Sequence, residues 1–183
     1  RYKEPVRNLL LGPSYDTASI QACLEKYSLA YTLFSKGEDL AVETARLLAL
    51  NNIIGWFQGR GEFGPRALGA RSILANPQPV AMKEKVNSIK RREQFRPFAG
   101  SILQEYVHEY FEIPSSERGF PFMNFCFRVK EEKRGQLNAI VHEDGTCRVQ
   151  TVTEQDGAYH RLIKEFQTRT GIPCILNTSF NLM

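Results

Sequence analysis

One glycine- and arginine-rich stretch has the composition of an anion-binding loop. It reads GRGEFGPRALGARS over residues 59–72 and follows the apolar run 53–57. Glycine has no Cβ, so backbone N–H groups can come close to a ligand there. Arginine binds planar or tetrahedral oxyanions through two parallel hydrogen bonds. We call this stretch the Gly/Arg loop. It predicts a phosphate or carboxylate site, although a glycine-rich turn with solvated arginines would have the same amino-acid composition.

The positive charge of the chain is concentrated in and after this loop. Residues 60–96 carry nine Lys/Arg against three Glu, a net charge of +6, whereas the whole chain carries +4. A local excess on an otherwise nearly neutral protein favours a focused anion site. A nucleic-acid track would give a similar sum, so the sign of the charge leaves both ligand classes open.

Two further polar stretches could complete such a site. The first, KRREQFRPF at 90–98, lies between a predicted helix and a predicted strand, where its cations either converge or complement the helix dipole as solvated charges. The second, NTSFN at 177–181, follows the predicted strand 172–176. Open α/β sheets place ligands at such strand ends, but an ordinary Asx or Ser turn has the same composition.

A fourth stretch, HEDGTCRVQ at 142–150, contains one candidate base and one candidate anion contact. These are His142 and Arg148. The alternative is a hairpin in which both side chains are exposed and have no functional role. The three histidines of the chain are far apart and lack an acidic ligand pair, so we expect no metal site in this chain. A Gly-x-Gly-x-x-Gly pattern at 59–64 is discounted as a dinucleotide motif because Pro65 follows it directly.

The elements that would position these stretches alternate between helix and strand. Helices are predicted over 16–27, 38–51, 79–89, 104–111 and 156–170, the last ending at Gly171. Strands are predicted over 53–57, 98–103, 122–129, 138–142, 147–152 and 172–176. An Asp-Gly hairpin turn is expected at 143–145. Together they predict an α/β (α+β) fold with a twisted mixed sheet flanked by helices.

The composition is that of one soluble globular domain with an ample core. Hydrophobic residues make up 42% of the 183 positions, and no run of 18 apolar residues or secretion leader occurs. The cysteines form no C-x-x-C pair, so we expect buried free thiols in the cytoplasm; they are Cys23, Cys126, Cys147 and Cys174. Neither end has the polar composition of a natural terminus, so we expect a piece of a longer protein.

Taken in order, these motifs resemble the C-terminal domain of the NodU/CmcH-type carbamoyltransferases. The matching stretches are GRGEFGPRALGARSIL, IKRREQFRPFA, PFM, HEDGTCRVQTV and NTSFN, which together span residues 59–181. One departure is Gly61 after Arg60, where the family usually has Phe or Met. The resemblance implies that residues 1–183 are a single YrdC-like domain. It also implies that an N-terminal domain of actin-like fold and the last C-terminal residues are missing.

The resemblance further implies a reaction. The YrdC-like domain would use carbamoyl phosphate and ATP, with Mg²⁺ bound to the ATP, to form carbamoyl adenylate. The N-terminal domain would then pass the carbamoyl group to a hydroxyl of a small molecule, assisted by a further metal ion. The chain's partners would thus be these two substrates, its own N-terminal domain and a hydroxyl acceptor, with no membrane; a homodimer is left open.

The resemblance also assigns residue roles. The K-x-R element of YrdC- and HypF-type proteins matches 90–92, and their S-x-N element matches 179–181. The expected catalytic residues are Lys90, Arg92 and Arg66. The residues expected at the nucleotide and its phosphates are Arg96, Ser179, Asn181 and Arg148. The residues expected at carbamoyl phosphate are Arg60, Arg71 and Glu62.

Two rival interpretations come from other functional classes. One is an RNA- or tRNA-binding module, or a threonylcarbamoyl-adenylate-type module, because related YrdC-like proteins act in tRNA modification. The basic segment has few aromatic residues for base stacking (Phe63, Phe95 and Phe98), which argues against nucleic acid. The other is a structural domain whose nucleotide site is idle in isolation.

Overall fold

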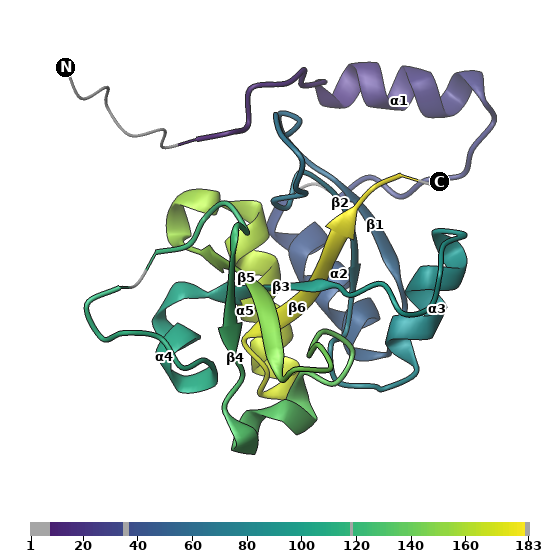
Figure 1. The fold of residues 1–183 in the computed structure, drawn as a ribbon. Helices are drawn as coiled ribbons and strands as arrows, with labels where there is room; N and C mark the ends of the chain where they lie inside the picture. The colour runs from purple at the N-terminus through teal and green to yellow at the C-terminus, as the bar shows by residue number, and fades with distance from the viewer. Residues whose placement is uncertain (1–7, 35–36, 118, 182–183) are drawn as a thin grey trace.

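A six-stranded mixed sheet organises the chain (Figure 1). The computed structural model describes residues 8–34, 37–117 and 119–181. The strands follow the order β1-β2-β6-β3-β5-β4, in which β3 and β5 are parallel and all other neighbours are antiparallel. Their bounds are β1 Ile54–Phe57, β2 Arg71–Ala75, β3 Ala99–Leu103, β4 Phe125–Arg128, β5 Thr146–Val152 and β6 Cys174–Ser179. The predicted α/β fold with a mixed sheet is thereby confirmed.

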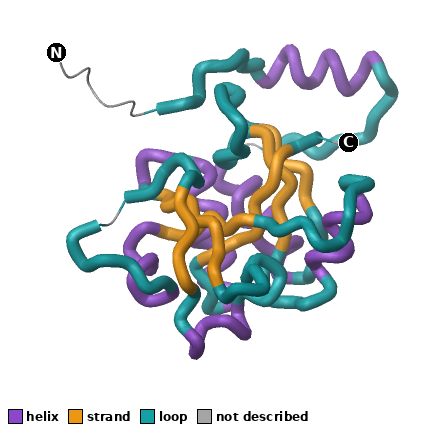
Figure 2. The backbone as a smooth tube through the Cα atoms, in the orientation of Figure 1, coloured by secondary structure: helices purple, strands orange, loops and turns teal. Residues whose placement is uncertain are grey.

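Helices surround the strands, which lie together at the centre of the molecule (Figure 2). Five are α-helical: α1 Thr17–Lys26, α2 Gly37–Ala49, α3 Met82–Ile89, α4 Val107–Tyr110 and α5 Ala158–Thr170. Three short 3₁₀ helices are η1 Gln104–Tyr106, η2 Glu131–Gln136 and η3 Glu154–Asp156. The helices α2 and α5 pack against each other, α2 also contacts β1, and α5 contacts β3 and β6. Helix α1 lies apart from the sheet (Figure 1).

The helix ends follow the local sequence signals. Asp16 caps α1, because its carboxylate accepts a hydrogen bond from the backbone N–H of Ser19 at 2.8 Å. Gly171 ends α5 in the left-handed conformation, with φ of 74°. The residues of α5 that share one face are all buried; they are Tyr159, Leu162, Ile163 and Phe166. The periodicity of this helix therefore places it against the sheet as predicted.

One predicted strand was wrong, and one strand of the sheet was not predicted. The stretch 138–142 is a turn, closed by hydrogen bonds from the N–H groups of Ile140 and Val141 to the carbonyl of Leu137. The Asp-Gly turn does form, with Gly145 at φ of 80°, but it precedes β5 without a paired strand before it. The strand β2 was missed, because its residues after Arg71 are all buried and show no alternation.

Strand β6 is longer than expected, and the cysteines are less buried. The strand runs through Ser179, so 177–179 belong to it and do not follow it. All four cysteines are free thiols, but Cys23 and Cys126 are exposed, which corrects the expectation that all are buried. Only Cys147 and Cys174 lie in the core. No helix in the described ranges is long and apolar enough to cross a membrane.

Gly69, between β1 and β2, is a position that requires glycine. Its φ is 96°, and a Cβ added there would lie 2.3 Å from Cδ1 of Tyr159. Its carbonyl accepts a hydrogen bond from the indole N–H of Trp56 at 2.9 Å. Backbone conformation and packing therefore both fix the Gly/Arg loop at this point.

We predict that Gly69→Ala lowers the free energy of unfolding by about 2–4 kcal/mol, because backbone strain and overpacking act together. Denaturant unfolding measures the change. Gly135→Ala is the control, since a Cβ there meets nothing within 4 Å, and it should change stability by less than about 0.5 kcal/mol. Equal destabilisation by the two substitutions would contradict the prediction.

Candidate functional site

Lys90, directly after α3, is a buried charged residue held by several hydrogen bonds. Its side chain is 1% exposed. The ammonium donates hydrogen bonds to Ser179 O at 2.7 Å and Oγ at 3.3 Å, and to Asn181 O at 3.0 Å and Oδ1 at 2.9 Å. All four acceptors are neutral. The structure thus brings together the predicted site residues Lys90, Ser179 and Asn181, which lie about ninety positions apart in the sequence.

The electrostatic environment of Lys90 weakens its hold on its proton. Burial, and then the positive charge of Arg92, lowers the pKa of Lys90 from 10.5 to about 8. At neutral pH the group is still mainly a cation. A buried cation with only neutral partners keeps its charge, and that charge can attract an anion bound beside it.

Arg92 lies next to Lys90 and is held from two sides. Its Nε donates to Oδ1 of Asn87 at 2.6 Å, and its guanidinium lies 4.6 Å from the ring centroid of Phe98. Its Nη2 is buried without a hydrogen-bond partner in the part of the chain that the structure describes. Burial, followed by the charges of Arg96 and Arg148, lowers the pKa of Arg92.

Arg148, in β5, extends this group of charges toward the Gly/Arg loop. Burial, and then the charge of Arg66, lowers the pKa of Arg148, whose Nε is buried without a hydrogen-bond partner among the described residues. Five predicted site residues are therefore linked by mutual repulsion; the cation cluster consists of Arg66, Lys90, Arg92, Arg96 and Arg148. A bound polyanion would relieve that repulsion.

The sheet topology explains why the cation cluster forms. In the register, Ala99 of β3 pairs with Arg148 of β5 on one side and Asn177 of β6 on the other. Because β6 is antiparallel to β3, the end of β6 lies beside the beginnings of β3 and β5. Within the described residues, only Arg96 of the five cations is paired with a carboxylate, that of Glu93 at 2.7 Å. The cluster therefore keeps its positive charge.

Asn87, which the sequence analysis did not identify, positions the segment that carries these cations. It is fully buried at the end of α3. Its Nδ2 donates to Gln94 O and Arg96 O, both at 3.2 Å, while its Oδ1 accepts from Arg92. One amide thus fixes both the backbone of the basic segment and one of its guanidinium groups.

The other charged residues of the Gly/Arg loop bind the protein's own backbone. Arg60 donates to Gly12 O and Leu11 O, both at 2.9 Å. Arg71 donates to the carbonyls of four residues, and its guanidinium lies 3.5 Å from the ring centroid of Phe57. Both guanidinium groups thus hold the loop through hydrogen bonds to backbone carbonyls. The contact of Arg60 and Arg71 with carbamoyl phosphate stays a prediction.

Glu62 acts in the same way on the other side of the loop. Its Oε1 accepts hydrogen bonds from the N–H groups of Leu68, Ala70 and Arg71 at 2.9, 2.7 and 3.0 Å. One carboxylate oxygen thus gathers three backbone donors, and the loop folds around it. Its predicted role at the ligand, like those of Arg60 and Arg71, stays a prediction.

A buried polar network attaches the loop to the centre of the sheet. Nδ2 of Asn177 donates to Ala67 O at 3.1 Å, Ser101 Oγ at 3.0 Å and Gln150 Oε1 at 3.2 Å. Nε2 of Gln150 donates to Leu68 O at 2.9 Å. Ser101 and Gln150 were not identified from sequence; the available signal was a polar residue at a strand position that must be buried.

Both ring nitrogens of His142 contact groups of the protein itself. Its Nδ1 lies 3.2 Å from Thr146 Oγ1, and its Nε2 lies 3.2 Å from the carbonyl of Phe98. Thr146 Oγ1 in turn donates to Asp144 at 2.7 Å. The histidine therefore supports Phe98, the residue beneath Arg92, and its ring nitrogens are engaged in these contacts.

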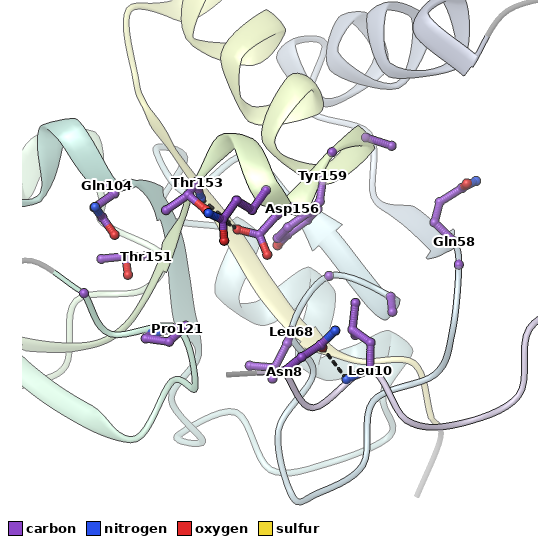
Figure 3. Close-up of a pocket in the computed structure, with 17 residues that line it drawn as sticks. Asn8, Leu10, Gln58, Leu68, Gln104, Pro121, Thr151, Thr153, Asp156 and Tyr159 are labelled. Atoms are coloured by element: carbon purple, nitrogen blue, oxygen red, sulfur yellow. Dashed lines mark hydrogen bonds between the residues drawn. The ribbon is translucent and has the colours of Figure 1, made fainter. Parts of the chain in front are cut away.

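A cavity of about 680 Å³ is separate from the cation cluster. In Figure 3, Thr153, Asp156 and Tyr159 lie on one side of it, and Asn8 and Leu10 lie opposite. No member of the cation cluster lines it.

A smaller cavity of about 290 Å³ does reach the cation cluster, because Arg66 lines it together with Phe122 and Asn124. Leu68 borders both cavities, so the Gly/Arg loop separates them. In the described part of the chain, no three His, Cys, Asp or Glu side chains are grouped as a metal site would require.

Comparison with known proteins supplies the family context. Residues 45–183 match the family model described as "Carbamoyltransferase C-terminus". The nodulation protein NolNO of Sinorhizobium fredii is 53% identical over 146 residues, which cover 79% of this chain and 22% of that protein. NolO of Bradyrhizobium diazoefficiens is 51% identical over 148 residues, covering 80% and 27%. The chain thus spans about a quarter of the length of these relatives.

Solved structures show the same fold at low sequence identity. Sua5 of P. abyssi in complex with L-threonine aligns with a TM-score of 0.56 and 15% identity, covering 79% of this chain and 39% of that one. Full-length HypF in its phosphate- and nucleotide-bound form aligns with a TM-score of 0.52 and 16% identity, covering 84% and 18%. The expected YrdC-like fold is confirmed by these neighbours.

We predict that Glu62→Ala lowers the free energy of unfolding by about 2–4 kcal/mol, because three backbone N–H groups lose a charged acceptor. Glu62→Gln should cost less, since the amide oxygen can still accept. The exposed Glu132 provides the control, as Glu132→Ala removes a carboxylate that lies at the surface. Denaturant unfolding measures all three, and similar values for Glu62→Ala and Glu132→Ala would contradict the assigned role.

Proposed function

The chain belongs to the carbamoyltransferase C-terminus family, and from this we propose that it binds ATP and carbamoyl phosphate and forms carbamoyl adenylate. The observation that carries the proposal is the cation cluster around the buried, neutrally coordinated Lys90. Its position at the ends of β6, β3 and β5, and the mutual repulsion of its members, suit a triphosphate and a second anion bound side by side.

The proposed reaction joins two anions. Carbamoyl phosphate reacts with water to give carbamate and phosphate. A carbamate oxygen then attacks the α-phosphorus of ATP, the bond from that phosphorus to the β-phosphate oxygen breaks, and pyrophosphate leaves. Such a step depends on positioning and on charge neutralisation, with little covalent participation by protein groups.

We propose that the cations are divided between the two substrates. We assign Lys90 and Arg92 to the phosphates of ATP, because their charges are adjacent and Nη2 of Arg92 lacks a protein partner. Arg96 would bind at the more exposed rim. Arg66, which lines the smaller cavity, and Arg148, whose pKa the charge of Arg66 lowers, would bind carbamoyl phosphate.

The remaining predicted residues act through others in this proposal. Ser179 and Asn181 orient the ammonium of Lys90 and would also contact the nucleotide. Arg60, Arg71 and Glu62 hold the Gly/Arg loop that presents Arg66. Mg²⁺ would be bound by the phosphates of ATP, since the described residues offer it no cage of carboxylates.

The rest of the overall reaction belongs to a longer polypeptide. The relatives are about four times as long as the region that they share with this chain. We propose that a preceding N-terminal domain transfers the carbamoyl group to a hydroxyl of a small molecule, with its own metal ion. The acceptor would then be selected outside the residues of this chain.

The proposed function is tested by pyrophosphate release from ATP, measured with and without carbamoyl phosphate. We expect release that requires carbamoyl phosphate and falls at least about a hundredfold in Lys90→Ala and Arg92→Ala, because each removes a charge that stabilises the transition state. Arg91→Ala is the matched control, since Arg91 lies between these residues and is exposed. Its rate should equal that of the unchanged protein.

Three outcomes would contradict the proposal. Equal loss in Arg91→Ala and Arg92→Ala would show that only the overall basic charge matters, as in nucleic-acid binding. ATP that binds but yields no pyrophosphate in the full-length protein would favour a catalytically idle domain. Salt-sensitive RNA binding in place of ATP binding would favour the nucleic-acid alternative.

The pH dependence of pyrophosphate release should reveal Lys90. Its pKa is lowered to about 8, so the free enzyme loses this positive charge as the pH rises through that value. We therefore predict that kcat/KM for ATP declines above about pH 8, whereas kcat declines only at higher pH, because bound phosphates favour the ammonium. Lys90→Arg, although slower, should not show the decline. A profile for the unchanged protein that stays flat to pH 9.5 would contradict this assignment.

A further inference from the structure

Residues 8–34, called the arm below, expose an unusual share of apolar surface. Fifteen large hydrophobic residues of the described chain are exposed, and seven of them lie in the arm, among them Ile20, Tyr27 and Leu29. Helix α1, at the centre of the arm, has no buried residue. It lies apart from the sheet in Figure 1. Apolar surface concentrated on one segment marks an interaction site.

The base of the arm is attached firmly to the Gly/Arg loop. The N–H of Gly12 donates to Gly61 O at 2.8 Å, and the N–H of Gly61 donates to Pro13 O at 3.1 Å. The N–H of Phe63 donates to Leu9 O at 2.7 Å. The guanidinium contacts of Arg60 to Leu11 and Gly12 add to these bonds. The arm therefore leaves the domain from a fixed point, and only its outer part lacks packing.

The outer part of the arm has an apolar face of helical spacing. Ile20, Leu24 and Tyr27 follow one another at intervals of four and three, which places them on one side of the helix. Ala18 and Ala22 lie on the opposite side. The charged residues of the arm are few, namely Asp16, Glu25 and Lys26. A partner for this face must therefore present an apolar surface.

We propose that the arm is a docking element for the rest of the same polypeptide, a folded domain with an apolar groove that receives Ile20, Leu24 and Tyr27. The family model begins at residue 45, so the arm lies outside the region that defines the family. The relatives carry about three quarters of their length beyond the shared region, which is enough chain for such a domain. The docked domain would contact the protein beside the Gly/Arg loop.

The size of the face favours an occupant in the same chain over a second copy. Stable interfaces between free partners use about 20–30 residues a side. Helix α1 has 10 residues. A domain joined by a short linker is held at an effective concentration in the millimolar range, so a small apolar contact is sufficient. The inference does not depend on carbamoyl adenylate being the product of the site.

Limited proteolysis and hydrogen exchange of the full-length protein test the inference. Trypsin can cleave after Lys26, in the last turn of α1, only when this helix is accessible. Two double variants are compared with the unchanged protein: Ile20→Glu with Leu24→Glu on the apolar face, and Ala18→Glu with Ala22→Glu on the opposite face. Mass spectrometry follows cleavage at Lys26 and exchange of the α1 amides.

We expect the apolar-face variant to be cleaved at Lys26 at least about ten times faster than the unchanged protein, since cleavage follows the accessible population. The opposite-face variant should behave as the unchanged protein. Equally fast cleavage in the unchanged protein and both variants would overturn the proposal, as would protection that disappears on dilution, which would identify a second copy as the occupant. Carbamoyl-phosphate-dependent pyrophosphate release in the same variants reports separately on the proposed function.

Discussion

The burial of one positively charged lysine is the constraint on which the site depends. An ammonium removed from water is costly unless hydrogen bonds replace its hydration. Lys90 obtains them from Ser179 and Asn181, and no carboxylate takes part in this coordination. The residue that follows α3 must therefore lie against the end of β6, the strand that sits between β2 and β3. A carboxylate partner would have neutralised the charge, whereas neutral oxygens leave it available to a ligand.

In the Gly/Arg loop, most of the charged residues that resemble ligand contacts instead hold the loop in its conformation. Two of its three arginines and its one carboxylate bind backbone groups, and the buried amides of Asn177 and Gln150 hold two of its carbonyls. The bonds from Asn177 and Gln150 satisfy polar groups that would otherwise be buried without partners between the loop and the sheet. Arg66 is the loop arginine whose charge acts on the cation cluster. Rigid support of one cation by several neighbours is what positioning of a charged substrate requires.

The sequence predicts those parts of the structure whose signals are local. Helix α5 has a clear apolar period and a glycine at its end, and both were recognised. Strand β2 has no alternation, because its residues after Arg71 are buried on both faces, and the apolar residues of 138–142 enter the core from a turn. At the site, the order of the motifs was sufficient to predict that Lys90 and Ser179 belong to the same site. It could not identify Asn87 or Ser101, because a single polar residue does not show which partner it binds. The partners of Asn87 lie within nine positions, whereas those of Ser101 lie in other strands.

The same lack of a local signal explains why the sequence could not show which arginines bind a ligand and which bind the protein's own backbone. An arginine beside glycines has the same local sequence whether its guanidinium binds a ligand or a carbonyl of its own chain. The outcome depends on which acceptors the fold brings within reach, and for Arg60 these are supplied by the arm. The arm therefore contacts the same loop that carries Arg66, and Leu9 of the arm lines the smaller cavity together with Arg66. A domain that docks on the arm would therefore act on the loop that carries Arg66. The hydrogen bonds between the arm and Arg60, Gly61 and Phe63 would then couple the contact between domains to substrate binding.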